Sequence, residues 1–280
     1  MLFFNSLRKG DSNMIREPAV AGQFYPGTKT GLEKTLSNLI DRKEKKEKVF
    51  GAVSPHAGYI YSGVVAGKVF SRILSKELFI IIGPNHTGVG EIFSIFAQGL
   101  WKTPLGSVGI DEEFADYLIA NSKLFKADES AHTYEHSIEV QIPFLQYLMN
   151  DFKILPLCIA NVDIDDLKTA AKELAVAIKA LKRDAVIIAS SDMTHYEPHK
   201  VAKTKDMEAI SAILNMREDE LWEKVTNMNI SMCGVAPVIV TLNAAKAIGA
   251  KDARLIDYKT SGDTSGDYSS VVGYGGVIIT

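Results

Sequence analysis

The chain has 280 residues, 46% of them hydrophobic, and carries 31 Lys and Arg against 34 Asp and Glu, for a formal net charge of −3. A chain of this length can bury a full core, either as one large α/β domain or as two small ones. The slight acidity gives no reason to expect a nucleic acid or an anionic membrane as partner, and no apolar run approaches the roughly 18 residues of a membrane span.

The two cysteines, Cys158 and Cys233, indicate a reducing compartment rather than a disulfide framework. Residues 1–13 lack the apolar core and cleavage site of a signal peptide, so we interpret them as a disordered tail or a mis-assigned start before Met14. No long linker, low-complexity tract or internal repeat divides the remaining residues. We therefore expect one cytoplasmic domain over residues 14–280.

The first part of the domain alternates between β-favouring runs and amphipathic stretches. Residues 16–26 form an ordered arm rich in Pro, Gly and aromatics, and a helix is expected over 32–45. A buried strand leads to the SPHAGYIYSG segment, and Ser62 or Gly63 opens the next helix. Strands are expected over 78–82, 91–97 and 108–110, with 101–106 as a turn. Asp111 is a favourable N-cap for a helix over 112–121.

The second part continues the same alternation. The segment after His136 runs into a helix in which Pro143 fits only the first turn. Further strands are expected over 152–157, 185–189, 253–259 and 271–279, and helices over 163–181, 203–214 and 218–227. A buried helix begins with Cys233 in its first turn and ends at Gly249, and residues 260–270 form a polar loop. This β-α-β order predicts an α/β fold with a central, mainly parallel or mixed sheet flanked by helices.

Three of the predicted buried strands are followed by histidines, and after the third strand the histidine lies among other polar residues. His56 and His86 come directly after apolar runs, and AVIIASSDMTHYEPH places Asp192 and His195 after the third. Because ligands of open α/β sheets bind at the carboxyl ends of strands, we expect these side chains to converge on one edge. Imidazole suits Fe, Cu and Zn, so His56 and His86 are candidate metal ligands.

His195 is either a third ligand or a general base, because its ordinary pKa suits proton transfer near neutrality. Asp192 stands three residues earlier and would orient the ring; an ordinary structural Asp–His hydrogen bond is the alternative. Cys233 is either a ligand or nucleophile, its thiolate stabilised by a helix N-terminus, or a core residue. Cys158 is predicted to be core.

The segment DESAHTYEHSIEVQ contributes further candidates. His132 and His136 are four residues apart, but Thr133 and Tyr134 separate them before any helix is established. We expect Glu135, His136 and Glu139, and also Tyr59 of the SPHAGYIYSG segment, to hydrogen bond the ligands or contact a substrate. The run Ser190-Ser191-Asp192 suggests a serine hydrolase only weakly, because no G-x-S-x-G elbow is present.

Taken together, these segments resemble the Memo family (mediator of ErbB2-driven cell motility) over roughly residues 16–279. The segments that carry the resemblance are REPAVAGQFYP, SPHAGYIYSG, GPNH, TPLG, EHSIEVQIPFL, SSDMTHY, MCG and GYGG. The Memo family in turn is similar to the class III extradiol ring-cleaving dioxygenases, which use non-haem Fe(II). The resemblance implies an α/β sheet with one cleft, in which His56, His86 and Cys233 match the metal positions. It places Asp192 and His195 in the same cleft, with His195 at the position of the dioxygenases' catalytic base.

One departure separates this chain from the dioxygenases. They bind iron through two histidines and a carboxylate, whereas the third position here is matched by Cys233. A thiolate is a softer ligand that favours Cu(I), Zn or a different iron redox potential, and a shared fold does not fix a function. Ring cleavage is therefore not implied.

Three hypotheses follow. In the first, His56, His86 and Cys233 hold a metal ion, Fe(II) ahead of Cu or Zn, in an oxidoreductase in which His195 moves protons. In the second, the chain is a non-enzymatic interaction protein whose dioxygenase-like cleft binds a peptide or small ligand. In the third, it is a metal-assisted or thiol hydrolase that uses Cys233 and His195. His132, His199, the loop 260–270 and the oligomeric state are left without assignment.

Overall fold

A mixed β-sheet passes through the middle of the molecule and carries the candidate site at one edge. The structure is a computed structural model that describes residues 14–280, so the extension expected over residues 1–13 lies outside the described part. The strands of the described residues are β1 (Ile15–Arg16), β2 (Gly51–Ser54), β3 (Leu78–Pro84), β4 (Phe93–Ile95), β5 (Leu100–Thr103), β6 (Gly106–Ile110), β7 (Lys126–Ala127), β8 (Lys153–Ile159), β9 (Ala185–Ser190), β10 (His195–Glu197), β11 (Ala253–Thr260) and β12 (Val271–Ile279). Their order in the sheet is β1-β5-β6-β8-β3-β9-β2-β12-β10, with β11 paired to β12 and β4 to β7 and β8.

The centre of the sheet is parallel, and antiparallel pairs occur nearer its margins. Strands β8, β3, β9 and β2 are parallel neighbours, with Ile81 opposite Ile188 and Ala52 also opposite Ile188. Every residue of β2, β3 and β9 is buried, as expected for parallel strands covered on both faces. Strand β12 joins this centre antiparallel through β2, and β5 pairs antiparallel with β6. The predicted α/β fold with a mainly parallel or mixed sheet is confirmed.

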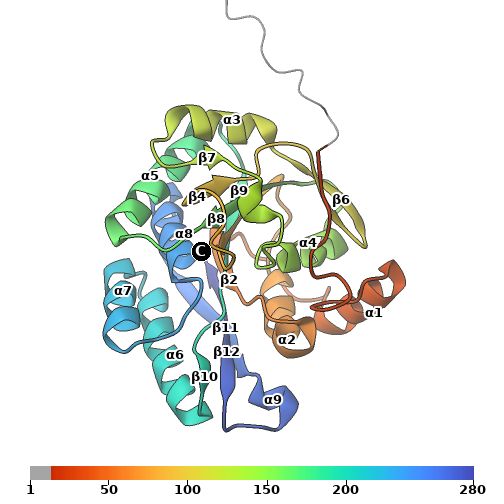
Figure 1. Cartoon of the computed structure of the whole chain (residues 1–280), viewed down its shortest axis with the longest axis vertical. Coiled ribbons are helices and arrows are strands. Elements are labelled where there is room, and N and C mark those ends of the chain that lie inside the picture. Colours follow the sequence, from red (N-terminus) through yellow and green to blue (C-terminus); the bar gives the residue numbers. More distant parts are fainter. Residues whose placement is uncertain (1–13) are drawn as a thin grey trace, which may run out of the picture.

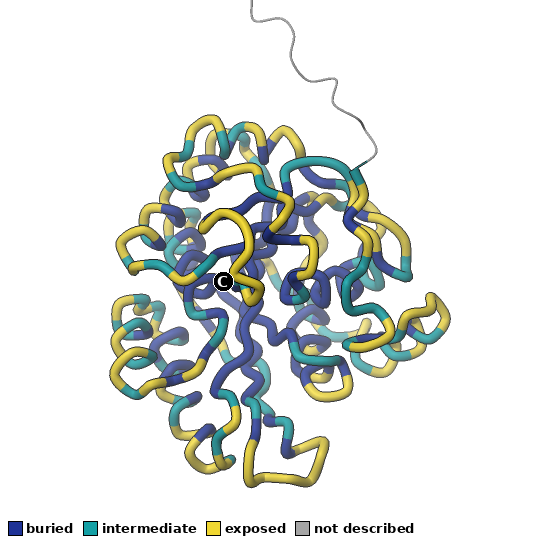
Figure 2. The backbone as a smooth tube through the Cα atoms, in the orientation of Figure 1, coloured by how far each residue is buried: buried dark blue, intermediate teal, exposed yellow. Residues whose placement is uncertain are grey.

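Helices cover both faces of the sheet (Figure 1). They are α1 (Lys29–Leu39), α2 (Tyr59–Phe70), α3 (Glu112–Asn121), α4 (Ile142–Leu148), α5 (Ile164–Ala180), α6 (His199–Leu214), α7 (Glu218–Asn227), α8 (Val235–Ile248) and α9 (Gly262–Ser265), with short 3₁₀ helices η1 (Ser130–His132) and η2 (Glu139–Gln141). One apolar core joins α3, α5, α6, α7 and α8 to the sheet, and a second joins α1, α2 and α4 to its other face. Figure 2 shows the strands between these layers as the most buried part of the chain.

Several helix ends follow directly from the sequence. The carboxylate of Asp111 accepts a hydrogen bond from the Phe114 amide and caps α3, as predicted. Pro143 lies in the first turn of α4, and Gly249 ends α8 with a φ of 120°, which favours glycine.

Several predicted boundaries were wrong. The first helix ends at Leu39 because the charged RKEKKEK run that follows has no apolar side to bury. Helix α2 begins at Tyr59 rather than at Ser62 or Gly63, since the Tyr59 amide donates to the Phe24 carbonyl outside the helix. The expected turn over 101–106 is largely strand β5, in which Trp101 is fully buried and only 104–105 turn toward β6.

Candidate metal centre

Three adjacent strands deliver candidate side chains to the same edge of the sheet. His56 follows the end of β2 by two residues, His86 follows β3 by two and Asp192 follows β9 by two. Because β3, β9 and β2 are parallel neighbours, these loops lie side by side, as the sequence predicted. One potential ligand atom each of His56, His86 and Cys233 lies within 4.8 Å of the other two.

His56 is held in one tautomer by a buried serine. Its Nδ1 lies 3.0 Å from Ser190 Oγ, while the Ser190 hydroxyl donates its only proton to the Ser137 carbonyl. Ser190 therefore accepts from His56, and the proton of the neutral ring sits on Nδ1. The free Nε2 lies 3.2 Å from Cys233 Sγ. Burial, followed by the nearby His136 and His86, lowers the pKa of His56 well below its usual value, so the ring is a neutral potential ligand.

His86 is held by the carboxylate of Glu135. The His86 backbone amide donates to Glu135 Oε2 at 2.7 Å, and its Nδ1 lies 2.9 Å from Oε1. Burial lowers the pKa of His86, but the hydrogen bond and charge of Glu135 outweigh it and the net pKa is raised. A carboxylate bonded to Nδ1 leaves Nε2 free to face the site, as in many metal-binding histidines.

Glu135 is itself saturated with donors. It also accepts hydrogen bonds from the His136 and Ser137 amides, both at 2.9 Å. Burial opposes its ionisation, yet these bonds and His86 lower the pKa of Glu135 to about 2. Glu135, His86 and His136 also form a group with metal-ligand spacing. Because the Glu135 oxygens already accept these hydrogen bonds, we interpret Glu135 as a residue that orients a ligand and not as a ligand itself.

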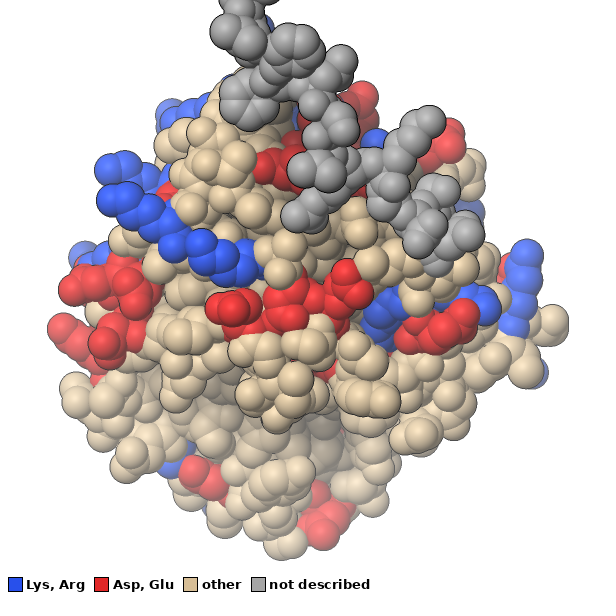
Figure 3. Space-filling model, turned by 45° about the horizontal axis from the view of Figure 1, so that its top comes forward, with Lys and Arg blue, Asp and Glu red and all other residues tan. Residues whose placement is uncertain are grey.

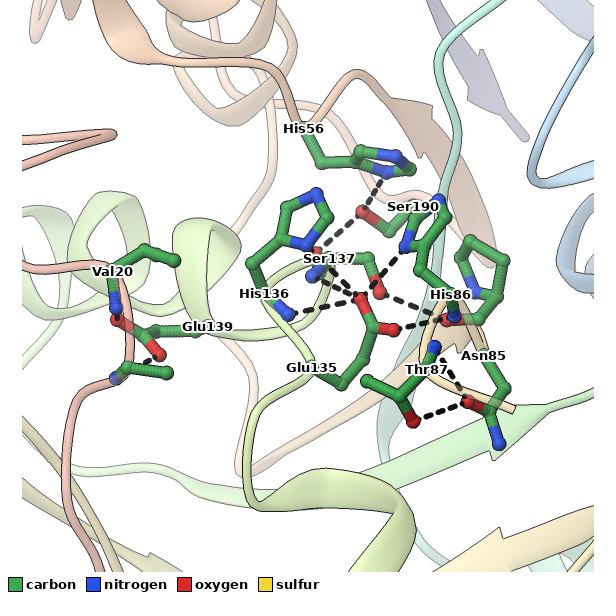
Figure 4. Close-up of polar contacts among 12 residues, drawn as sticks. Val20, His56, Asn85, His86, Thr87, Glu135, His136, Ser137, Glu139 and Ser190 are labelled. Carbon is green, nitrogen blue, oxygen red and sulfur yellow. Dashed lines mark hydrogen bonds and ion pairs between the residues drawn. The ribbon is translucent and has the colours of Figure 1, made fainter. Parts of the chain in front are cut away.

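The His136 ring lies beside the rings of His56 and His86. Its ring centroid is 5.5 Å from that of His56 and 4.8 Å from that of His86, with which it is stacked. Figure 4 shows the three histidines gathered around Glu135 and Ser190. The sequence predicted His136 as a neighbour of the ligands, and the structure puts it among them.

Cys233 lies two residues before α8 rather than in its first turn. Burial, followed by the charge of Asp192, raises the pKa of the Cys233 thiol. The stabilisation of a thiolate by the helix N-terminus stays a prediction. Gly234 brings Cys233 to the site, because a Cβ there would lie 2.4 Å from the Ser190 carbonyl oxygen and from Ser191 Cβ. Cys158 is fully buried in β8, as predicted.

His195 is not oriented by Asp192. Its Nδ1 lies 2.8 Å from the Ser231 carbonyl oxygen, and its amide donates to Ser231 Oγ at 2.7 Å. Asp192 instead accepts a hydrogen bond from the His56 amide at 2.8 Å. The Ser231 carbonyl can only accept, so the proton is on Nδ1 and Nε2 of His195 is an available base. Sequence reasoning missed Ser231 because it lies 36 residues away.

Two further candidates do not lie at the site. The Tyr59 hydroxyl donates to the Val140 carbonyl, and its ring packs between Tyr25 and Phe144 in the core. Glu139 lies apart from the histidines in Figure 4 and holds the N-terminal arm through the Ala19 and Val20 amides. The sequence placed Glu139 and Tyr59 near the ligand motifs. Closeness in sequence does not show whether such a side chain stabilises the fold or contacts a ligand.

The two unassigned histidines lie outside the cluster. His132 is fully buried against Phe96 and Trp101, and neither ring nitrogen has a hydrogen-bond partner within residues 14–280. His199 begins α6 and lies 3.1 Å from Thr260 Oγ1.

Comparison with known proteins identifies the family. The family model described as Memo-like protein matches residues 16–278. The chain belongs to the Memo family. A MEMO1 family protein of Methanosarcina acetivorans is 45% identical over 95% of this chain and 99% of its own length, and one of Aquifex aeolicus is 45% identical over 94% and 98%. A MEMO1 family protein of Methanocaldococcus jannaschii is 44% identical over 95% of this chain and 99% of its own length.

A solved structure supports the fold of this Memo family protein. An uncharacterized protein of Escherichia coli K12 superposes with a TM-score of 0.53 over 80% of this chain and 98% of the other, at 11% identity. At that identity the likeness concerns the fold alone, and it does not confirm the expected resemblance to extradiol dioxygenases.

The surface adds little about partners. On the face shown in Figure 3, basic and acidic side chains lie next to each other, and a broad lower area carries few charges. Within residues 14–280, no helix combines the length and the apolar character needed to cross a bilayer.

Proposed function

We propose that this Memo family protein binds one redox-active metal ion, Fe(II) or copper, through His56, His86 and Cys233. The observation that carries the proposal is the convergence of these three side chains, whose ligand atoms lie within 4.8 Å of one another. The two imidazoles have their Nδ1 atoms bonded to Ser190 and Glu135, which leaves each Nε2 for a metal.

The donor set fits a transition metal better than a hard cation. Two neutral imidazole nitrogens and one sulfur suit Fe, Cu or Zn, whereas Ca²⁺ and Mg²⁺ prefer oxygen. Three protein ligands would leave coordination positions free for a substrate or O₂. The bound metal would supply electron transfer or Lewis-acid activation at those positions.

The surrounding side chains supply proton transfer. His195 is half-buried and its Nε2 is available to accept a proton from a bound molecule, because Nδ1 donates to Ser231. Asp192 is buried and accepts a hydrogen bond from the His56 amide; burial raises its pKa to about 6. Asp192 can therefore exchange a proton near neutral pH.

A thiol hydrolase that works without metal is a weaker reading. The pKa of the Cys233 thiol is raised, and its ring neighbour is His56, which burial keeps neutral, rather than His195. An activated thiol nucleophile needs a lowered pKa or a base that can take its proton.

Metal content is the first test. The protein would be purified without oxygen and its iron, copper and zinc measured, beside His56→Ala and Cys233→Ser. We expect near-stoichiometric iron or copper in the wild type and its loss in both variants. His199→Ala and Cys158→Ala serve as matched controls and should keep the metal.

Each other outcome has a definite meaning. Zinc alone would replace the redox proposal by hydrolysis or structural stabilisation. A wild type that takes up no metal, even after Fe(II) or Cu(I) is supplied, would overturn the proposal and favour a cleft that binds a peptide or small ligand.

A further inference from the structure

The N-terminal arm of the described chain runs across the loop that supports the metal site. We call residues 16–25 the strap and residues 132–139 the support loop. The strap ends beside the site, where the Phe24 ring lies 4.8 Å from that of His136. The support loop contributes Glu135, which holds His86.

Arg16 of the strap is buried against the support loop, with 4% of its surface exposed. Its Nε donates to the His132 carbonyl at 3.1 Å, and its Nη2 donates to the Glu135 carbonyl at 2.6 Å. Its third nitrogen, Nη1, pairs with the Glu139 carboxylate. One planar guanidinium thus connects the two ends of the support loop with the residue at its middle.

Trp101 fixes the plane of this guanidinium. The Arg16 Cζ lies 4.6 Å from the centre of the Trp101 ring, on the strand that pairs with β1. A stacked guanidinium has its donors in a fixed fork, which a lysine ammonium cannot reproduce.

The contacts form a short path to a potential ligand. Arg16 binds the main chain of Glu135, and the Glu135 carboxylate binds both the amide and Nδ1 of His86, which leaves His86 Nε2 for a metal. We infer that Arg16 is a positioning residue of the metal centre, whose fork holds Glu135 where it orients the His86 ring. This inference rests on the proposed metal binding.

Glu139 has a different part in the same network. It joins the strap to the support loop through Arg16, the Ala19 and Val20 amides and the Tyr25 hydroxyl, and none of these bonds reaches His86. Arg16 therefore makes two contributions that can be tested separately. Its charge pairs with Glu139, and its planar fork of donors binds two carbonyl oxygens.

Two complementary variants make this separation. Arg16→Lys keeps the charge beside Glu139 but loses the fork, whereas Glu139→Gln loses the ion pair and keeps the fork. Co²⁺ would be titrated into the full chain, stripped of metal, against a competing chelator, and its d–d and thiolate absorption bands recorded. Melting temperatures would be measured on the same samples.

We expect Arg16→Lys to bind Co²⁺ about tenfold more weakly, with shifted d–d bands, because supporting contacts of ligands change affinity by about 10–100-fold. Glu139→Gln should lower the melting temperature yet keep the Co²⁺ spectrum and an affinity within about twofold. If Arg16→Lys does not fold, the double variant R16M/E139Q, in which no charge is left unpaired, replaces it with the same expectation.

An unchanged Co²⁺ spectrum and affinity in the folded Arg16 variant would overturn the inference. So would an equal loss in Glu139→Gln, because attachment of the strap would then be what matters. A wild type that binds no Co²⁺, or binds it equally after Cys233→Ser, would instead refute the proposed metal site.

Discussion

Two buried carboxylates stand at the same edge of the sheet and have opposite properties. Glu135 accepts hydrogen bonds from three backbone amides and the His86 ring, and its pKa falls to about 2. Asp192 accepts from the His56 amide, and burial raises its pKa to about 6. The comparison teaches that the donors and the neighbouring His86 outweigh burial at Glu135, whereas burial prevails at Asp192, so only Glu135 is a permanent anion.

The difference gives each carboxylate a separate task. A permanent anion fixes the tautomer and direction of His86, whereas a carboxyl group that titrates near pH 6 can hold or release a proton beside His195. Environments that drive two pKa values apart are a common way to divide acid–base roles.

The largest effect is expected for Glu135→Gln, which removes the permanent anion. The shift of the Glu135 pKa from 4.5 to about 2 corresponds to about 3 kcal/mol of stability, present above pH 4.5 and lost as the pH falls toward 2. Denaturant unfolding at pH 7 should show a loss of this order. Metal affinity should fall about 10–100-fold, measured by competition with a chelator. An unchanged metal affinity would show that Glu135 does not support the metal ligands.

In the protein freed of metal, Asp192→Asn is expected to raise the free energy of unfolding, whereas Glu135→Gln lowers it. The Asp192 pKa rises from 3.8 to about 6, so ionisation in the folded state is costly and stability falls as the pH rises between these values. Asparagine keeps the acceptor for the His56 amide and removes this cost of about 3 kcal/mol. The variant should therefore gain stability relative to the wild type at pH 7 and lose this gain at pH 4. An equal difference at both values would contradict the assignment.

His132 shows how burial changes the pKa of a histidine that has no charged hydrogen-bond partner within residues 14–280. Burial lowers its pKa from 6.5 to about 4, so the unfolded chain binds a proton that the folded chain refuses. Stability should fall by about 2 kcal/mol as the pH drops from 6.5 to 5. His132→Leu should remove this dependence in unfolding experiments at several pH values. If the variant keeps the wild-type slope, other groups cause it.

The smallest effect is expected for Phe24→Ala at the end of the strap. The Phe24 ring is half-buried and contacts His136, so its removal should cost about 1 kcal/mol of stability. The wild-type hydrogen bonds of Glu135 do not involve Phe24, and metal affinity should stay within about threefold. A loss as large as that of Glu135→Gln would show that the strap controls the site through His136 instead.

Much of the arrangement was readable because the signals are local. The apolar runs before His56 and His86 are buried parallel strands, and the predicted caps at Asp111 and Gly249 lie where expected. The strand containing Trp101 was missed because its residues alternate between exposed and buried over only four positions. A pattern this short does not distinguish a strand from a turn.

The sequence by itself determined the α/β alternation and the edge of the sheet to which the histidines belong, because periodicity and strand ends are properties of neighbouring residues. Its motif segments carried the resemblance to the Memo family. Only the tertiary structure decided which groups support them. Ser190 meets His56 across 134 residues, Glu135 meets His86 across 49 and Ser231 meets His195 across 36. Such partners depend on how separate loops pack, and pKa values follow from the same packing because burial and donors both come from distant segments.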